Sequence, residues 1–176
     1  YNKTNMYVPK KNLVITDEHM ACARRLLEDR SSRYETWGWK EPRTSLFLDL
    51  WAGLNPDIKF IFLYREPYQA IESALRGMQR RYLYIRPWLA PMAWIHYNEE
   101  LLKFFYKNPE KAKFVSINRF NASPEMASKT LGAWLNFEFT HPYSDVYHPQ
   151  DMSSGKKRNL SFPINMYMWL ARTIFE

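Results

Sequence analysis

Two short apolar runs interrupt a chain in which most other apolar residues recur at helical spacing. The runs cover 58–64 and 112–117, and their length and composition predict strands covered on both faces, as in a parallel sheet. A further extended segment is expected over 35–40, where two tryptophans flank Gly38. Helices are expected over 17–30, 44–53, 67–77, 90–106, 124–136 and 163–175.

The order of these elements predicts an α/β fold. A strand over 35–40, a helix over 44–53 and a strand over 58–64 would form a βαβ unit, which joins parallel strands. Lys40 would then end the strand that lies beside the one leading to Arg65. With 176 residues and no internal repeat or linker, the chain is expected to be one domain, a parallel sheet flanked by helices.

Composition narrows the partners and the compartment. The net charge of +7 favours an anionic partner such as a nucleotide, a phosphate or sulfate donor, nucleic acid or a membrane surface. Cys22 is the one cysteine of the chain, so no internal disulfide can form, and a reducing, cytoplasmic location is expected, with the Golgi lumen as the alternative. No apolar run approaches the roughly 20 residues that a membrane helix needs.

Candidate chemistry lies where the strand over 58–64 ends. Arg65 directly follows this strand, Pro67 stands at the expected start of a helix, and Ser73 comes eight positions after the arginine. Open α/β sheets bind ligands at the carboxyl ends of their strands. A guanidinium gives charge-assisted, bidentate hydrogen bonds to phosphate, and a hydroxyl adds another donor. The pattern favours a phosphate site, although a surface-paired arginine and a solvated serine would have the same spacing.

Two stretches, 40–43 and 65–73, together resemble the donor-binding elements of sulfotransferases that use 3′-phosphoadenosine 5′-phosphosulfate (PAPS). The matching residues are Lys40, Glu41, Pro42, Arg43, Arg65 and Ser73. The resemblance covers about 34–137 and implies a nucleotide-kinase-like parallel α/β fold of the P-loop type. It also implies in-line sulfuryl transfer from PAPS to a hydroxyl or amine acceptor, without a metal.

The resemblance implies a role for each group of residues. Arg65 and Ser73 would hold the 3′-phosphate, and Lys40 would contact the sulfuryl group, where a cation offsets charge growing on the leaving phosphate. Arg43 would reach the donor or acceptor, or pair with Glu41 or Asp49. Acceptor contacts are also expected from Tyr82 and Tyr84. A basic loop would close over the 3′-phosphate, and it comprises Gly155, Lys156, Lys157 and Arg158.

The chain departs from the family pattern in three places. The Lys/Arg-Ser-Gly-Thr-type loop that cradles the 5′-phosphosulfate has no counterpart, so we expect the first strand and this loop to lie upstream of Tyr1. The usual catalytic histidine would fall at Pro42, which leaves Glu41 and His96 as candidate bases, although either could be a structural hydrogen-bonding group. Ile117 stands where the family has a tyrosine that contacts adenine.

Two other classes remain alternatives at this point. One is another phosphate-handling transferase or kinase of P-loop type, which would need a Walker-type lysine and magnesium carboxylates, and neither motif is present in the sequence. The other is a non-catalytic basic module that binds nucleic acid through interleaved charged and aromatic residues. The stretch, which we expect instead to form a lid over an acceptor pocket, contains Arg80, Arg81, Tyr82, Tyr84 and Arg86.

Overall fold

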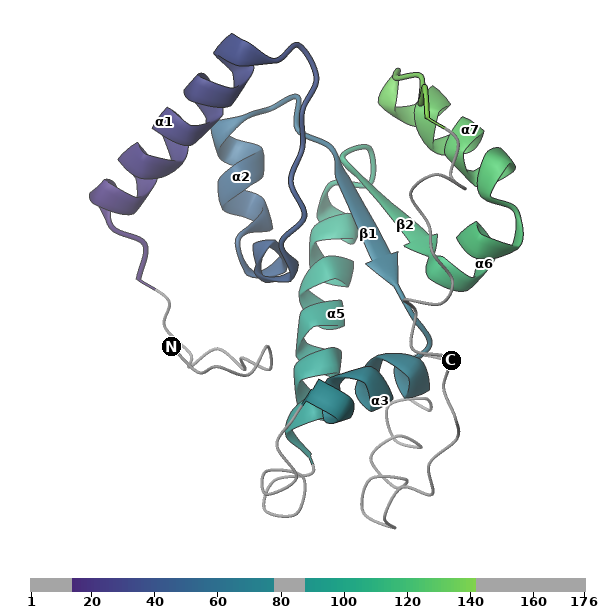
Figure 1. The fold of residues 1–176 in the computed structure, drawn as a ribbon. Coiled ribbons are helices and arrows are strands. Elements are labelled where there is room, and N and C mark those ends of the chain that lie inside the picture. The colour runs from purple at the N-terminus through teal and green to yellow at the C-terminus, as the bar shows by residue number, and fades with distance from the viewer. Residues whose placement is uncertain (1–13, 78–87, 142–176) are drawn as a thin grey trace.

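The structure is a computed structural model that describes residues 14–77 and 88–141 (Figure 1). Its elements in chain order are α1 (Asp17–Arg33), η1 (Pro42–Leu46), α2 (Leu48–Leu54), β1 (Phe60–Tyr64), α3 (Pro67–Gly77), α5 (Leu89–Lys107), β2 (Ala112–Ser116), α6 (Ile117–Ala122) and α7 (Pro124–Leu135). Three parts of the sequence-based prediction lie outside the described residues. They are the stretch with Tyr82 and Tyr84, the basic loop at 155–158 and the helix over 163–175.

A parallel sheet forms the centre of the described part of the molecule. β1 and β2 pair in parallel, with Phe60 opposite Ala112 and Tyr64 opposite Ser116. The connection between them passes through α3 and α5, as parallel strands require a long crossover. The expected mixed α/β fold, with a small parallel sheet flanked by helices, is therefore confirmed.

The core lies on the face of the sheet that α2 and α5 cover (Figure 1). Aromatic side chains of β1 point toward α5, and the Phe60 and Phe104 rings meet edge to face with their centroids 5.1 Å apart. Edge-to-face pairs of this kind are favoured by the quadrupoles of the two rings. The buried members of this core are Leu48, Phe60, Phe62, Phe104 and Ala112.

The opposite face of the sheet is more open than predicted. Ile61 and Leu63 of β1 are 39% and 55% exposed, although the apolar run predicted a strand covered on both faces. Next to them, the carboxyl end of α7 contacts this region through Trp134. The Lys59 ammonium donates a hydrogen bond to the Trp134 carbonyl at 2.5 Å and lies 5.1 Å from the centroid of the Trp134 ring. Among the described residues, α7 thus covers this face only in part.

The prediction of a strand over 35–40 is wrong. This segment is irregular and pairs with neither β1 nor β2, so the βαβ unit is β1–α3–α5–β2 instead. Its tryptophans explain the difference, because they pack through their rings. Trp37 and Trp39 stack with centroids 5.6 Å apart, and Trp39 packs on Trp51 of α2 at 5.1 Å. Lys40 therefore does not end a strand beside β1.

The helix boundaries follow local capping. α3 has the predicted bounds, and α1, α5 and α7 lie within a few residues of theirs. The helix expected over 44–53 is split at Phe47 into η1 and α2, and the helical segment begins earlier than expected because Glu41 rather than Thr44 caps its first turn. The short helix α6 was not predicted; it begins after Ser116, whose hydroxyl accepts from the Arg119 amide at 3.4 Å.

Candidate active site

The carboxyl end of β1 joins directly to α3. Arg65 follows Tyr64, the last residue of the strand, and α3 begins at Pro67. The first turn of α3 is closed by a hydrogen bond from the Ala70 amide to the Glu66 carbonyl at 3.1 Å. Arg65 and Ser73 are both half-buried. The strand–turn–helix arrangement predicted for a phosphate site is therefore present, with both of its polar residues on one continuous unit.

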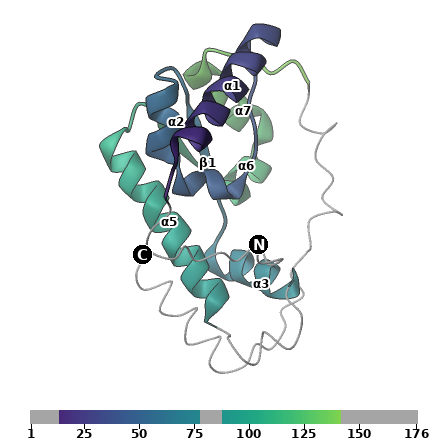
Figure 2. The same ribbon diagram turned by 90° about the vertical axis from the view of Figure 1, so that its left-hand side faces the viewer.

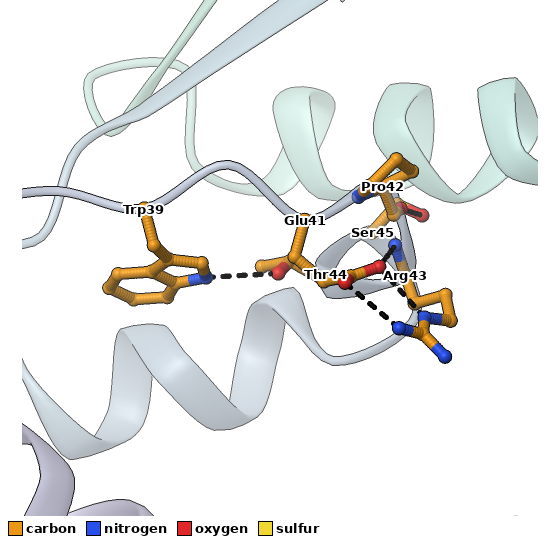
Figure 3. A network of polar contacts seen from close by, with 6 residues as sticks. All are labelled: Trp39, Glu41, Pro42, Arg43, Thr44 and Ser45. Carbon is orange, nitrogen blue, oxygen red and sulfur yellow. Dashed lines mark hydrogen bonds and ion pairs between the residues drawn. The ribbon is translucent and has the colours of Figure 1, made fainter.

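The turn that follows Lys40 is built around the carboxylate of Glu41 (Figure 3). One oxygen accepts from the Arg43 amide at 3.1 Å and from Arg43 Nε at 2.7 Å, and the other accepts from Arg43 Nη2 at 2.9 Å. A planar guanidinium and a carboxylate match in this bidentate geometry. Of the two partners that the sequence offered to Arg43, the structure thus selects Glu41, while Asp49 pairs with Lys107 at 2.9 Å.

The hydrogen bonds from Arg43 change the acid–base character of Glu41. The side-chain hydrogen bonds from Arg43, followed by its backbone hydrogen bond, lower the pKa of Glu41 from 4.5 to about 2. The nearby Lys40 charge adds a smaller effect in the same direction. Hydrogen bonding to the charged form of a carboxylate is the expected cause of such a shift. Glu41 is therefore ionised and a weak proton acceptor at neutral pH.

Helix α5 connects the two parts of the candidate site. It packs against η1 and also against α3. Figure 2, in which α1 lies in front, shows one end of α5 beside α3. The Lys40–Arg43 turn and the Arg65–Ser73 unit therefore adjoin the same helix. His96, the second candidate base, lies on α5, and its Nε2 is buried without a hydrogen-bond partner among the described residues.

A groove that the sequence did not reveal lies between β2, α6 and α7. Its volume is about 400 Å³, and its lining includes Lys113, Ser116, Arg119 and Phe120. Because Ser116 is the last residue of β2, the groove reaches the same edge of the sheet as Arg65. The sequence feature that indicates a helix start beside this groove is Ser116, a helix-capping residue type at the end of an apolar run.

A more voluminous hollow lies elsewhere, along α7 and residues 136–141, with a volume of about 1020 Å³. The described residues contain no cluster of histidine, cysteine, aspartate or glutamate that could hold a metal ion. None of the described helices is long and apolar enough to cross a membrane.

Comparison of the chain with protein-family models, curated proteins and solved structures found no match.

Proposed function

We propose that this chain is a sulfotransferase domain that uses PAPS as its sulfuryl donor, with a P-loop-type sulfotransferase fold. The observation that supports it best is the strand–turn–helix unit, in which Arg65 follows a parallel strand and Ser73 lies on the next helix. The placement of a second cationic element, the Lys40–Arg43 turn, against the same helix α5 adds to this support. The positive net charge suits a donor that carries several phosphate and sulfate charges.

In the proposed reaction, an acceptor oxygen or nitrogen attacks sulfur while the bond from sulfur to the 5′-phosphate oxygen breaks. The products are the sulfated acceptor and adenosine 3′,5′-bisphosphate, and the acceptor proton passes to a base. Arg65 and Ser73 bind the 3′-phosphate, and Lys40 stabilises negative charge that develops on the leaving phosphate. His96 is the better of the two candidate bases, because Arg43 already occupies the Glu41 carboxylate.

Binding of the donor product tests the assignment of the phosphate site. Adenosine 3′,5′-bisphosphate should bind, and Arg65→Ala should weaken this binding by about 1.5–3 kcal/mol, the range for a hydrogen bond to a charged group. Arg65→Lys should recover only part of the loss, since an ammonium cannot reproduce the bidentate geometry. Isothermal titration calorimetry measures all three proteins.

Adenosine 5′-phosphate is the matched ligand control, because it lacks the 3′-phosphate. Its binding should change little in Arg65→Ala. Arg33→Ala is the matched protein control, since it removes an exposed arginine of α1 that pairs with Asp29. Equal losses for both nucleotides in Arg65→Ala, or a loss in Arg33→Ala as large as that in Arg65→Ala, would contradict the assignment of Arg65 to the 3′-phosphate.

A further inference from the structure

The Glu41 carboxylate is held by one residue through three hydrogen bonds. The Arg43 amide, Nε and Nη2 all donate to it, and the two side chains remain 41% and 53% exposed. The backbone bond also makes Glu41 the cap of η1. One side chain therefore fixes both the start of the turn and the plane of the Arg43 guanidinium.

The same turn is attached to the core from its other side. Trp39 Nε1 donates to the Thr44 hydroxyl at 3.1 Å, and the Trp39 ring packs on Trp51 (Figure 3 shows the Thr44 bond). Within the turn, the Ser45 hydroxyl donates to the Pro42 carbonyl at 2.8 Å. The Trp39 indole N–H consequently reports on the geometry of the turn without any added probe.

We propose that Glu41 is a positioning residue, which clamps Arg43 and η1 and so fixes the backbone from which the Lys40 side chain extends. Lys40 directly precedes Glu41, so a change in the Glu41 backbone displaces the origin of the lysine side chain. The catalytic consequence rests on the proposed sulfuryl transfer. The clamp itself rests on the observed contacts and can be tested without turnover.

A clamp and a general base respond oppositely to removal of Arg43. If Glu41 is a clamp, Arg43→Gln disrupts the turn and should reproduce the effect of Glu41→Gln. If Glu41 is a base, Arg43→Gln removes the guanidinium that lowers its pKa, so the carboxylate becomes more basic and proton transfer should become easier. For a clamp, the double variant that carries both Glu41→Gln and Arg43→Gln should show no larger effect than either single variant, because both substitutions remove the same interaction.

Nuclear magnetic resonance gives the activity-independent test. In the wild-type protein the Glu41 carboxyl ¹³C signal should stay flat between pH 8 and pH 3.5, and in Arg43→Gln, which lacks the guanidinium but keeps the residue-43 amide, it should titrate at a higher pH than in the wild type. The Trp39 indole N–H signal should move in both Glu41→Gln and Arg43→Gln, and Glu41→Asp should restore it partly. Glu100→Gln, which breaks the exposed Glu100–Lys103 pair on α5, is the control and should leave it unmoved.

Kinetics add the catalytic test in protein that binds adenosine 3′,5′-bisphosphate and transfers sulfuryl groups. Glu41→Gln and Arg43→Gln should each lower kcat by about tenfold with the donor KM changed less than twofold, since misplacement of a catalytic group affects the transition state. If the Trp39 and Glu41 signals of Arg43→Gln are the same as those of the wild type, the clamp is overturned. Retained or increased kcat in Arg43→Gln, with the bisphosphate still bound, would overturn the positioning role while leaving the proposed function standing.

Discussion

The carbonyl of Phe137 lies so close to Gly132 that no larger residue fits without movement. A Cβ at this position of α7 would lie 2.6 Å from the Phe137 oxygen, and the chain after α7 turns back through Asn136 in the left-handed region at φ 55°. The hydrogen bond from the Phe137 amide to the Gly132 carbonyl, at 2.9 Å, fixes this arrangement. Glycine is needed here for its lack of a side chain, not for its backbone angles.

Gly132→Ala should therefore lower the free energy of unfolding by about 1–3 kcal/mol, as overpacking against a fixed backbone does. Gly53→Ala is the control, because a Cβ at Gly53 of α2 meets nothing within 4 Å. In that helix alanine should be neutral or stabilising by up to about 1 kcal/mol. Urea unfolding of both variants decides the comparison, and equal destabilisation would mean that the close approach at Gly132 relaxes without cost.

The Glu41–Arg43 pair should also give stability a pH dependence. The pKa of Glu41 in the folded protein is about 2, below its ordinary 4.5, so its contribution is present above pH 4.5 and is lost as the pH falls toward 2. The difference in unfolding free energy between wild type and Glu41→Gln should thus be constant from pH 6 to 8 and shrink below pH 5. The difference should be small because both side chains are largely exposed to water. Chemical denaturation across this range tests it, and a difference that grows in acid would contradict the shift.

Among the helices and strands, the sequence correctly predicted the ones whose boundaries depend on neighbouring residues in the chain. Proline at the first position of α3 and the apolar runs of β1 and β2 were sufficient for these three elements. The prediction of a strand over 35–40 failed because alternating tryptophans suit both a strand and a surface-packed irregular segment. Its ring contacts with Trp51 depend on where α2 lies, and no local pattern contains that information.

At the scale of the whole molecule, the candidate site also has parts that the sequence predicts and parts that depend on the fold. The strand–turn–helix unit with Arg65 and Ser73 could be predicted because its strand, proline and helix are contiguous in the chain. The pairing of Arg43 with Glu41, two residues away, was one of two options that the sequence offered, and the structure decides between Glu41 and Asp49. The groove beside Ser116 was missed, since it forms where β2 and α7 meet. Contacts between distant segments, unlike caps and runs, require the tertiary structure.

The parallel pairing of β1 with β2 sets the order in which the molecule can fold. Phe60 pairs with Ala112, so the sheet closes only after the intervening chain has been brought together, whereas α1 forms from local contacts and a Thr16–His19 capping box. Phe62→Leu, in the sheet, should slow folding, and Thr16→Ala, at the cap of α1, should mainly speed unfolding. Stopped-flow measurements in urea separate the two rates. A Thr16→Ala variant that folds as slowly as Phe62→Leu would instead place α1 in the folding nucleus.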